Sequence, residues 1–200
     1  VPLPKHYEED IIIAQMDPKK DADGFHQLNL RAILSGEPRI IPAVALAIVA
    51  LIDKAIRMKY SLSEAHAESR GLRQAQALNN LKAVLVVNRT EFAAPIELLL
   101  EERGALVHII LRAKKMTPEI VARIKDADVV VAARGHANII SGDMLKDGTI
   151  VIDAGTNQLP DGRVVGDIDF DSTRDMKGFI TPVPGGVGPV TVAMLLENTL

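Results

Sequence analysis

The sequence predicts an α/β fold built around a Rossmann-like parallel sheet, because short apolar segments alternate with helix-compatible segments in its second half. The apolar segments are rich in Val and Ile, which is typical of strands buried on both faces of a sheet. The intervening helices supply the right-handed crossovers that parallel strands require. We therefore expect a Rossmann-like domain over about residues 80–180, with four strands at 83–87, 106–111, 128–133 and 149–153.

Ahead of this domain, the chain is expected to consist mostly of loop and helix. Residues 1–30 are rich in turn signals, with one short helix expected near 7–14. A helix is expected over Pro42–Tyr60, because Pro suits a first helical turn and the apolar residues that follow lie on all sides. Residues 61–80 are polar, rich in Ala and compatible with a helix.

Three further helices are expected around the strands. The first spans Pro95–Arg103 and ends at Gly104, which suits a helix C-cap. The second begins at Thr117-Pro118, with Thr as the N-cap and Pro at the first helical position. The last is a terminal helix over Thr191–Leu200.

The composition argues against several classes of protein. The formal net charge of −3 and the scarcity of aromatic residues (no Trp, two Tyr, four Phe) do not suit nucleic-acid binding. The absence of Cys excludes disulfides and thiolate metal sites. The longest largely apolar run, Ile40–Ile52, is shorter than the roughly 20 residues of a bilayer span, and the first residues lack a signal-peptide pattern. We expect a cytoplasmic protein with no nucleic-acid or membrane partner.

Carboxylates alternate at Asp167, Asp169 and Asp171, a pattern that raises the question of a calcium loop. An EF-hand loop also needs a bidentate Glu at its twelfth position, which is Gly178 in this chain. The five His residues show no metal-binding spacing. We therefore expect no metal site and interpret the three carboxylates as a solvated strand edge or turn.

Two loops that follow predicted strands carry basic residues, and parallel sheets bind ligands at the carboxyl ends of their strands. The first loop, Asn88-Arg89-Thr90, lies in a stretch without Gly from Lys82 to Arg103, so its guanidinium and hydroxyl would have to hold a phosphate. The second loop, Arg112–Lys115, has three basic residues in four, which favours a ribose 2′-phosphate and hence NADP over NAD. The alternative for each loop is a solvated surface turn.

Two segments that contain Gly complete the candidate site. In Ile152–Asn157, Gly155 lets the backbone approach the nicotinamide half of a dinucleotide, whereas Asp153 is either functional or structural. In Pro182–Thr191, three Gly and three Pro fix an unusual backbone path before a helix N-terminus. Such a segment suits a planar, partly anionic ligand.

Several segments resemble the motifs of one enzyme family. Residues 1–6 resemble the end of a Gln-Leu-Pro-Leu-Pro motif, and Pro18–Phe25 resembles Pro-x-Lys-Asp-Val-Asp-Gly-Phe with Ala22 as the only change. Further matches follow in the family's order at Ser141–Met144, Val151–Asn157, Asp161–Asp167 and Thr181–Leu200. The chain thus resembles the bifunctional methylenetetrahydrofolate dehydrogenase / methenyltetrahydrofolate cyclohydrolase family.

This resemblance implies two domains with a folate cleft between them. Residues 1–41 would be the remainder of an incomplete, smaller α/β catalytic domain, which the C-terminal helix at 185–200 completes, and residues 42–184 the Rossmann-like NADP-binding domain. The implied reaction is the NADP-dependent oxidation of 5,10-methylenetetrahydrofolate to methenyltetrahydrofolate, followed by hydrolysis to 10-formyltetrahydrofolate. NAD is the alternative cofactor, and the implied assembly is a homodimer.

The resemblance also implies roles for individual residues. The tetrahydrofolate substrate would contact Asp23, which would hydrogen-bond the pterin, and Pro184, Gly185, Gly186, Val187 and Gly188. The cofactor would contact Asn88, Arg89, Thr90, Arg112 and Thr156.

Some features depart from the family's pattern. Its catalytic lysine stands in a Tyr-x-x-x-Lys helix, whereas here Ile11 and Glu64 stand four residues after Tyr7 and Tyr60. We therefore expect that lysine to lie upstream of residue 1 and expect no catalytic residue in this chain. The family's Gly-Arg-Ser loop is replaced by Asn88-Arg89-Thr90, and residues 61–80 resemble an insertion. Two alternatives remain: a catalytically silent folate- or nucleotide-binding relative, and a ligand-free Rossmann module that dimerises.

Overall fold

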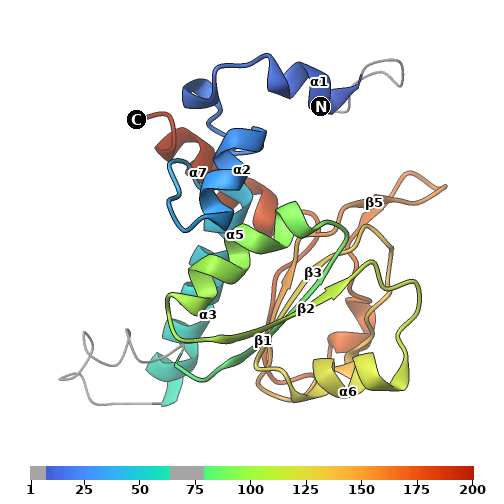
Figure 1. The fold of residues 1–200 in the computed structure, drawn as a ribbon. Helices are drawn as coiled ribbons and strands as arrows, with labels where there is room; N and C mark the ends of the chain where they lie inside the picture. The colour runs from blue at the N-terminus through green and yellow to red at the C-terminus, as the bar shows by residue number, and fades with distance from the viewer. Residues whose placement is uncertain (1–7, 64–78) are drawn as a thin grey trace.

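The computed structural model describes residues 8–63 and 79–200, and Figure 1 shows their ribbon. The first family motif, Tyr7 and most of the 61–80 segment lie outside the described residues. The α-helices are α1 (Glu9–Ala14), α2 (Gln27–Leu34), α3 (Ala43–Ser63), α5 (Thr90–Glu101), α6 (Pro118–Asp126) and α7 (Val187–Glu197). Short 3-10 helices are η1 (Pro18–Lys20), η2 (Gly142–Met144) and η3 (Asp171–Thr173). The strands are β1 (Lys82–Val87), β2 (Leu106–Leu111), β3 (Val129–Ala133), β4 (Ile150–Asp153), β5 (Asn157–Gln158), β6 (Val164–Val165) and β7 (Phe179–Ile180).

Five of these strands form one parallel sheet in the order β2-β1-β3-β4-β7. This arrangement confirms the predicted α/β fold and the four predicted strands. The edge strand β7 was not predicted, because two residues are too few to give a pattern. The chain passes from β1 to β2 on one side and then to β3 on the other. The direction of winding therefore reverses beside β1, which is where open α/β sheets bind ligands.

Helices cover both faces of the sheet. Successive side chains of a strand point to opposite faces, so Leu85 of β1 packs in one apolar cluster with Ile52 of α3, and Val86 packs in the other with Ile124 of α6. Figure 1 shows α3 and α5 on one side of the sheet and α6 on the other. The all-round apolar character of α3 follows from this position, since α7 packs against it as well.

The first crossover helix begins earlier than the sequence suggested. Helix α5 starts at Thr90, five residues before Pro95, which lies inside it and is buried. A proline there removes the N–H that would bond to the carbonyl of Glu91. A proline in the first helical turn would break no such bond, so the sequence alone favours a helix start at Pro95. Pro95 was therefore misread as a helix start, although the helix tolerates it in its second turn.

The terminal helix also begins earlier, at Val187 instead of Thr191. Pro189 takes the third helical position, where a backbone N–H has no partner within the helix in any case.

Helix α2 was missed, because residues 1–30 were interpreted as mostly loop. Its N-cap is His26, whose Nδ1 accepts a hydrogen bond from the Leu28 N–H at 3.1 Å.

The other helix starts agree with expectation. Helix α3 begins directly after Pro42, and α6 begins after Thr117, whose hydroxyl accepts a hydrogen bond from the Ile120 N–H. Among the described residues, no helix has both the length and the apolar character needed to cross a bilayer.

The core position of β1 gives a first prediction. Leu85 is fully buried in the central part of the sheet, so Leu85→Ala should lower the free energy of unfolding by about 2–5 kcal/mol through lost contacts and a residual cavity. Leu34 of α2 is 69% exposed, so the matched control Leu34→Ala should change it by less than about 0.5 kcal/mol. Urea denaturation measures both values, and equal losses would contradict the assigned core.

Candidate functional site

The carboxyl ends of three neighbouring strands lie level with one another. In the parallel register, Val87 of β1 is paired with Leu111 of β2 on one side and with Ala133 of β3 on the other. The residues that follow these strands are Asn88, Arg112 and Arg134, so they leave the sheet side by side. This edge is the candidate cofactor site.

Asn88 is the common partner of two arginines at this edge. The Nε of Arg112 donates to the Asn88 backbone oxygen at 3.2 Å, and the Nη1 of Arg134 donates to Asn88 Oδ1 at 3.4 Å. The Nε of Arg134 also donates to the Ala113 carbonyl oxygen at 2.9 Å. The side chain of Arg134 therefore extends from the end of β3 across Asn88 to the loop after β2.

Arg134 was not among the predicted site residues. The signal that would have identified it is its position, because it is the first residue after a predicted strand of a parallel sheet. Arg112 was predicted, and its backbone has a positive φ of +52°, which a non-Gly residue adopts at a cost in free energy.

Arg89 and Thr90 lie at the start of α5, and both are exposed. Arg89 is the N-cap residue with an extended backbone, and its side chain makes no capping hydrogen bond. The first N–H groups of a helix have no partner within the helix, and they attract anions. A phosphate at this position would therefore meet free helix N–H groups beside the Arg89 guanidinium and the Thr90 hydroxyl.

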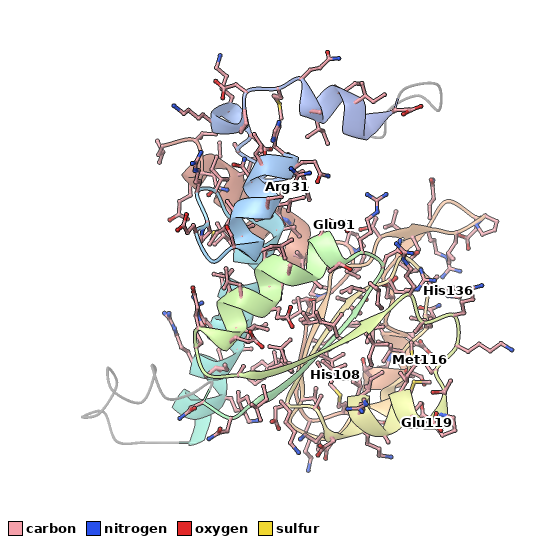
Figure 2. All side chains as sticks on the ribbon, viewed as in Figure 1. Arg31, Glu91, His108, Met116, Glu119 and His136 are labelled. Carbon is pink, nitrogen blue, oxygen red and sulfur yellow. The ribbon has the colours of Figure 1, made fainter. Side chains whose placement is uncertain are left out.

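A buried carboxylate fixes the loop that carries Arg134. Asp167 was interpreted as a solvated carboxylate, and this was wrong: it is fully buried and accepts hydrogen bonds from the backbone N–H groups of Arg134, Gly135 and His136. It also accepts one from Asn157 Nδ2 at 2.9 Å. Figure 2 shows His136 in this loop beside the carboxyl edge of the sheet. One side chain therefore holds the loop after β3 and the segment after β4 together.

Asp153 forms a second buried carboxylate next to the first. Its Oδ1 accepts from the N–H groups of Gly155 and Asp167, and its Oδ2 accepts from the N–H of Ile168. A Cβ atom at Gly166 would overlap this carboxylate, so that position has no room for a side chain. Burial raises the pKa of Asp153 above its ordinary value, although the backbone hydrogen bonds oppose the shift. These contacts favour the structural interpretation of Asp153 over the functional one.

Thr156 is exposed on the segment that these carboxylates hold. The neighbouring Asn157 donates from Nδ2 to the Gly166 carbonyl oxygen at 3.2 Å as well as to Asp167. The backbone around Thr156 is thus fixed on the side of the sheet near β4, whereas Arg112 lies near β2.

The segment over residues 184–188 leads into α7. The Val183-Pro184 peptide bond is cis, and Gly185 has a positive φ of +102°. A Cβ atom at Gly186 would clash with the Pro182 carbonyl oxygen, and the side chain of Val187 belongs to the core. Pro184, Gly185 and Gly188 are exposed, so a ligand here would meet mainly backbone.

The loop that carries Asp23 is held from beneath by Asp21. The buried Asp21 carboxylate accepts from the Gly24 N–H, from the His26 N–H and from Asn29 Nδ2, at 3.1, 2.7 and 2.9 Å. Asp23 itself is exposed. Its carboxylate is therefore available to a ligand.

The structure does not bring Asp23 and the 184–188 segment together. Asn198, which caps the C-terminal end of α7, donates from Nδ2 to the carbonyl oxygens of Ala22 and Ile41 at 2.8 and 3.0 Å. The 184–188 segment lies at the other end of this 11-residue helix, which is about 16 Å long. The two predicted groups of substrate residues thus occupy opposite ends of α7.

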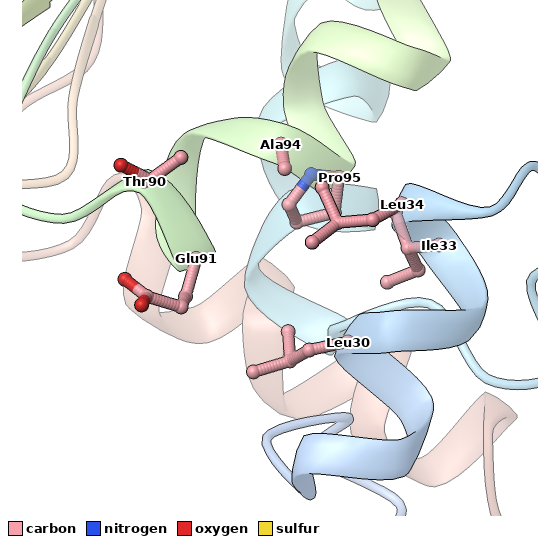
Figure 3. A pocket seen from close by; sticks show the side chains of 7 residues that line it. All are labelled: Leu30, Ile33, Leu34, Thr90, Glu91, Ala94 and Pro95. Atoms are coloured by element: carbon pink, nitrogen blue, oxygen red, sulfur yellow. The ribbon is translucent and has the colours of Figure 1, made fainter.

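A shallow apolar pocket lies between α2 and the first turns of α5 (Figure 3). Its lining residues are Leu30, Ile33, Leu34, Thr90, Glu91, Ala94 and Pro95. Thr90 is the single predicted site residue among them. Within the residues that the structure describes, no group of His, Cys, Asp or Glu side chains is arranged to hold a metal ion.

Comparison with known proteins gives consistent matches. The family model for "Tetrahydrofolate dehydrogenase/cyclohydrolase, NAD(P)-binding domain" matches residues 69–200. The chain is 39% identical over 200 residues to the bifunctional protein FolD of Polynucleobacter asymbioticus, and 38% identical to that of Campylobacter concisus. Each alignment covers all of this chain and 63% of the relative, so the chain spans less than two thirds of the length of these curated relatives.

Solved structures agree with the sequence matches. The bifunctional enzyme FolD from Campylobacter jejuni superposes with a TM-score of 0.74 at 32% identity. A methylenetetrahydrofolate dehydrogenase-cyclohydrolase from Trypanosoma brucei, complexed with NADP cofactor and inhibitor, gives 0.75 at 34% identity. Both alignments cover 100% of this chain and 63% of the other chain.

The buried position of Asp153 leads to a stability prediction. Asp153→Asn places an amide NH₂ against backbone donors, so at neutral pH it should cost about 1–3 kcal/mol of unfolding free energy. Because burial raises the pKa of Asp153, the folded chain keeps this proton to a higher pH than the unfolded chain. The stabilisation that the parent chain gains from this raised pKa is present in acid, and it is lost as the pH rises through the pKa of Asp153 in the folded state.

The difference in the free energy of unfolding between the parent chain and Asp153→Asn should therefore be larger at acidic pH than at neutral pH. Urea denaturation at a series of pH values measures it, with the exposed Asp175→Asn as the matched control. A gap that widens towards neutral pH would contradict the raised pKa, and a variant as stable as the parent would contradict the structural role.

Proposed function

The chain belongs to the tetrahydrofolate dehydrogenase/cyclohydrolase family, and we propose that it serves an enzyme of one-carbon folate metabolism. The proposed reaction is NADP-dependent oxidation of 5,10-methylenetetrahydrofolate to methenyltetrahydrofolate, followed by hydrolysis to 10-formyltetrahydrofolate. The proposal applies to the whole protein, since the chain spans 63% of its curated relatives. We propose a cytoplasmic location for it.

The observation that carries the proposal is the convergence of cationic groups on the carboxyl edge of the sheet, beside its topological switch point. Arg112 and Arg134 contact Asn88 there, and the open N-terminus of α5 follows in the chain. A dinucleotide brings phosphates to this position in a Rossmann fold. We assign cofactor contacts to Asn88, Arg89, Thr90, Arg112 and Thr156, with NADP as the cofactor.

The substrate contacts are assigned to the two ends of α7. Asp23 offers an exposed carboxylate on a fixed loop, which suits the N–H donors of a pterin ring. The segment Pro184, Gly185, Gly186, Val187 and Gly188 offers backbone groups at the helix N-terminus. A folate is an elongated molecule with polar groups at both ends, so one molecule is suited to two separate sets of contacts. We propose a boundary between the folate part and the cofactor part after residue 41.

In the proposed reaction, the residues of this chain bind and orient the substrate. NADP, when bound, supplies the hydride acceptor for the folate methylene carbon, and loss of the hydride leaves the methenyl cation. A water molecule adds to that carbon, a proton is released, and one carbon–nitrogen bond opens to give the formyl product. We assign no proton-transfer step to a residue of this chain.

The second candidate is a catalytically silent relative that binds folate. One feature favours it, namely that the stretch from Lys82 to Arg103 contains no Gly. A Gly-rich turn is what usually lets a pyrophosphate approach the backbone in this fold.

We propose that the protein forms a homodimer through the edge strand β2. This strand exposes Leu106 and Leu111, at 57% and 44%, and within residues 8–63 and 79–200 its outer edge pairs with no other strand, which suits pairing with a second copy. Replacing both residues with Lys should convert a dimer into a monomer in sedimentation equilibrium. The control pair Val192→Lys and Leu196→Lys on α7 should leave the dimer intact, and dissociation by the control pair alone would contradict this interface.

Calorimetry tests the proposed function. The 200-residue chain should bind NADP and a folate analogue, each more tightly in the presence of the other, because they would share one cleft. Asp23→Asn should weaken the folate analogue by roughly tenfold, the usual loss for a hydrogen bond to a charged group, and leave NADP unchanged. The exposed Asp175→Asn is the matched control.

The outcomes separate the candidates. Folate binding without NADP binding would support the silent relative over the dehydrogenase. Binding of neither ligand would contradict both, and an Asp175→Asn effect equal to that of Asp23→Asn would contradict the assigned pterin contact.

A further inference from the structure

We propose that Arg134 determines cofactor preference by binding the ribose 2′-phosphate of NADP together with Arg112. The inference rests on the proposed function and adds a residue that the family resemblance did not assign. Its basis is the place of two guanidinium groups above the ends of β1, β2 and β3.

The two arginines are fixed close to each other through Asn88. Arg112 contacts the backbone oxygen of Asn88, and Arg134 contacts its side-chain oxygen. A guanidinium has five N–H donors, and these contacts leave most of them unused. Arg134 uses Nε on the Ala113 carbonyl oxygen and one Nη1 donor on Asn88, so three donors remain for a ligand.

Neither guanidinium forms an ion pair within the described residues, because the nearby Asp167 carboxylate accepts from backbone N–H groups and from Asn157 instead. The ion pairs of residues 8–63 and 79–200 join Lys82, Arg103, Lys146, Arg163 and Arg174 to carboxylates, and neither Arg112 nor Arg134 takes part. Two guanidinium groups held near each other without an ion-pair partner repel, and an anionic ligand relieves that repulsion.

The backbone on both sides of the site is fixed before a ligand arrives. The buried Asp167 carboxylate accepts the N–H groups of residues 134–136, which holds the start of the loop after β3. Arg112 is held in a left-handed conformation, with its N–H bonded to the Val87 carbonyl oxygen at 2.9 Å. A strained residue beside a fixed loop is typical of a ligand site.

The direction of the Arg134 side chain selects the phosphate that it would bind. In a Rossmann fold the pyrophosphate lies at the N-terminus of the first helix, which is α5 here, and the loop after the second strand faces the adenosine ribose. Arg134 reaches away from β3, past Asn88, to the carbonyl of Ala113 in that second loop. Its free donors therefore lie on the ribose side, where a 2′-phosphate accepts paired N–H bonds from a guanidinium.

Binding of NADP and NAD to the parent chain and to three variants tests the inference. Arg134→Gln should weaken NADP by roughly tenfold to hundredfold, the range for lost hydrogen bonds to a charged group, and should change NAD by less than about twofold. Arg134→Lys should be intermediate, because an ammonium keeps the charge without the paired geometry. Arg174→Gln removes the same charge from an exposed pair with Asp171 and should change neither affinity.

Adenosine 2′,5′-bisphosphate and ADP extend the test to ligands without nicotinamide. Arg134→Gln should weaken the first by the same factor as NADP and leave the second unchanged. Thermal unfolding and circular dichroism of Arg134→Gln and Arg134→Lys establish that the variants are folded. If Arg134→Gln were unfolded, the selectivity of the Arg134→Lys variant would decide the matter.

Each contrary outcome is distinct. Equal weakening of NADP and NAD by Arg134→Gln would overturn the assignment, as would no weakening at all. A parent chain that binds NAD as tightly as NADP would overturn this inference and leave the proposed function standing. A parent chain that binds neither dinucleotide would contradict the proposed function itself.

Discussion

The carboxyl edge of the sheet depends on two buried carboxylates. Asp153 and Asp167 together accept hydrogen bonds from seven N–H donors, six of them in the backbone. Burying a charge is costly unless hydrogen bonds compensate it, and here each oxygen has at least one donor. Since these donors belong to the loop after β3, the segment after β4 and residues 167–168, the two side chains join three connections of the chain outside the five-stranded sheet.

This arrangement explains how a sheet of apolar strands supports a polar edge. The strands themselves are held by side chains packed on both faces, with Leu85 and Val86 as examples from β1. Beyond the last residues of the strands, hydrogen bonds between polar groups replace apolar packing. Asn88 accepts from two arginines, and Asp167 holds the backbone from which one of them, Arg134, extends. The site is therefore built from the contacts that replace packing where the strands stop.

Much of the fold could be predicted from the sequence because its signals are local. Four strands appear as short runs rich in Val and Ile, and Thr117-Pro118 marks a helix start by capping chemistry alone. Helix α5 was placed too late, because Pro95 resembles a first-turn proline, and its burial against the core cannot be seen in the sequence. Strand β7 has two residues and is set by pairing with β4.

The candidate site was predicted less completely, for a physical reason. Asn88, Arg89 and Arg112 were predicted because they follow predicted strands, and the same rule applied to the third strand would have added Arg134. The structural role of Asp153 depends on donors from residues 155, 167 and 168, which come together only in the folded chain. The separation of Asp23 from the 184–188 segment depends on the packing of α7, which no local pattern encodes.

The length of helix α7 consequently sets the distance between the 184–188 segment and the loop that carries Asp23. The N-terminal end of the helix carries Gly186 and Val187, and its C-terminal cap, Asn198, is tied by one amide group to Ala22 and Ile41, which lie 176 and 157 positions away in the chain. The C-terminal end cannot shift along the helix axis without breaking these two bonds. Insertion or deletion of one residue would move one end by about 1.5 Å and rotate it by about 100° relative to the other. Evolution is therefore free to vary the exposed side chains of this helix far more easily than its length.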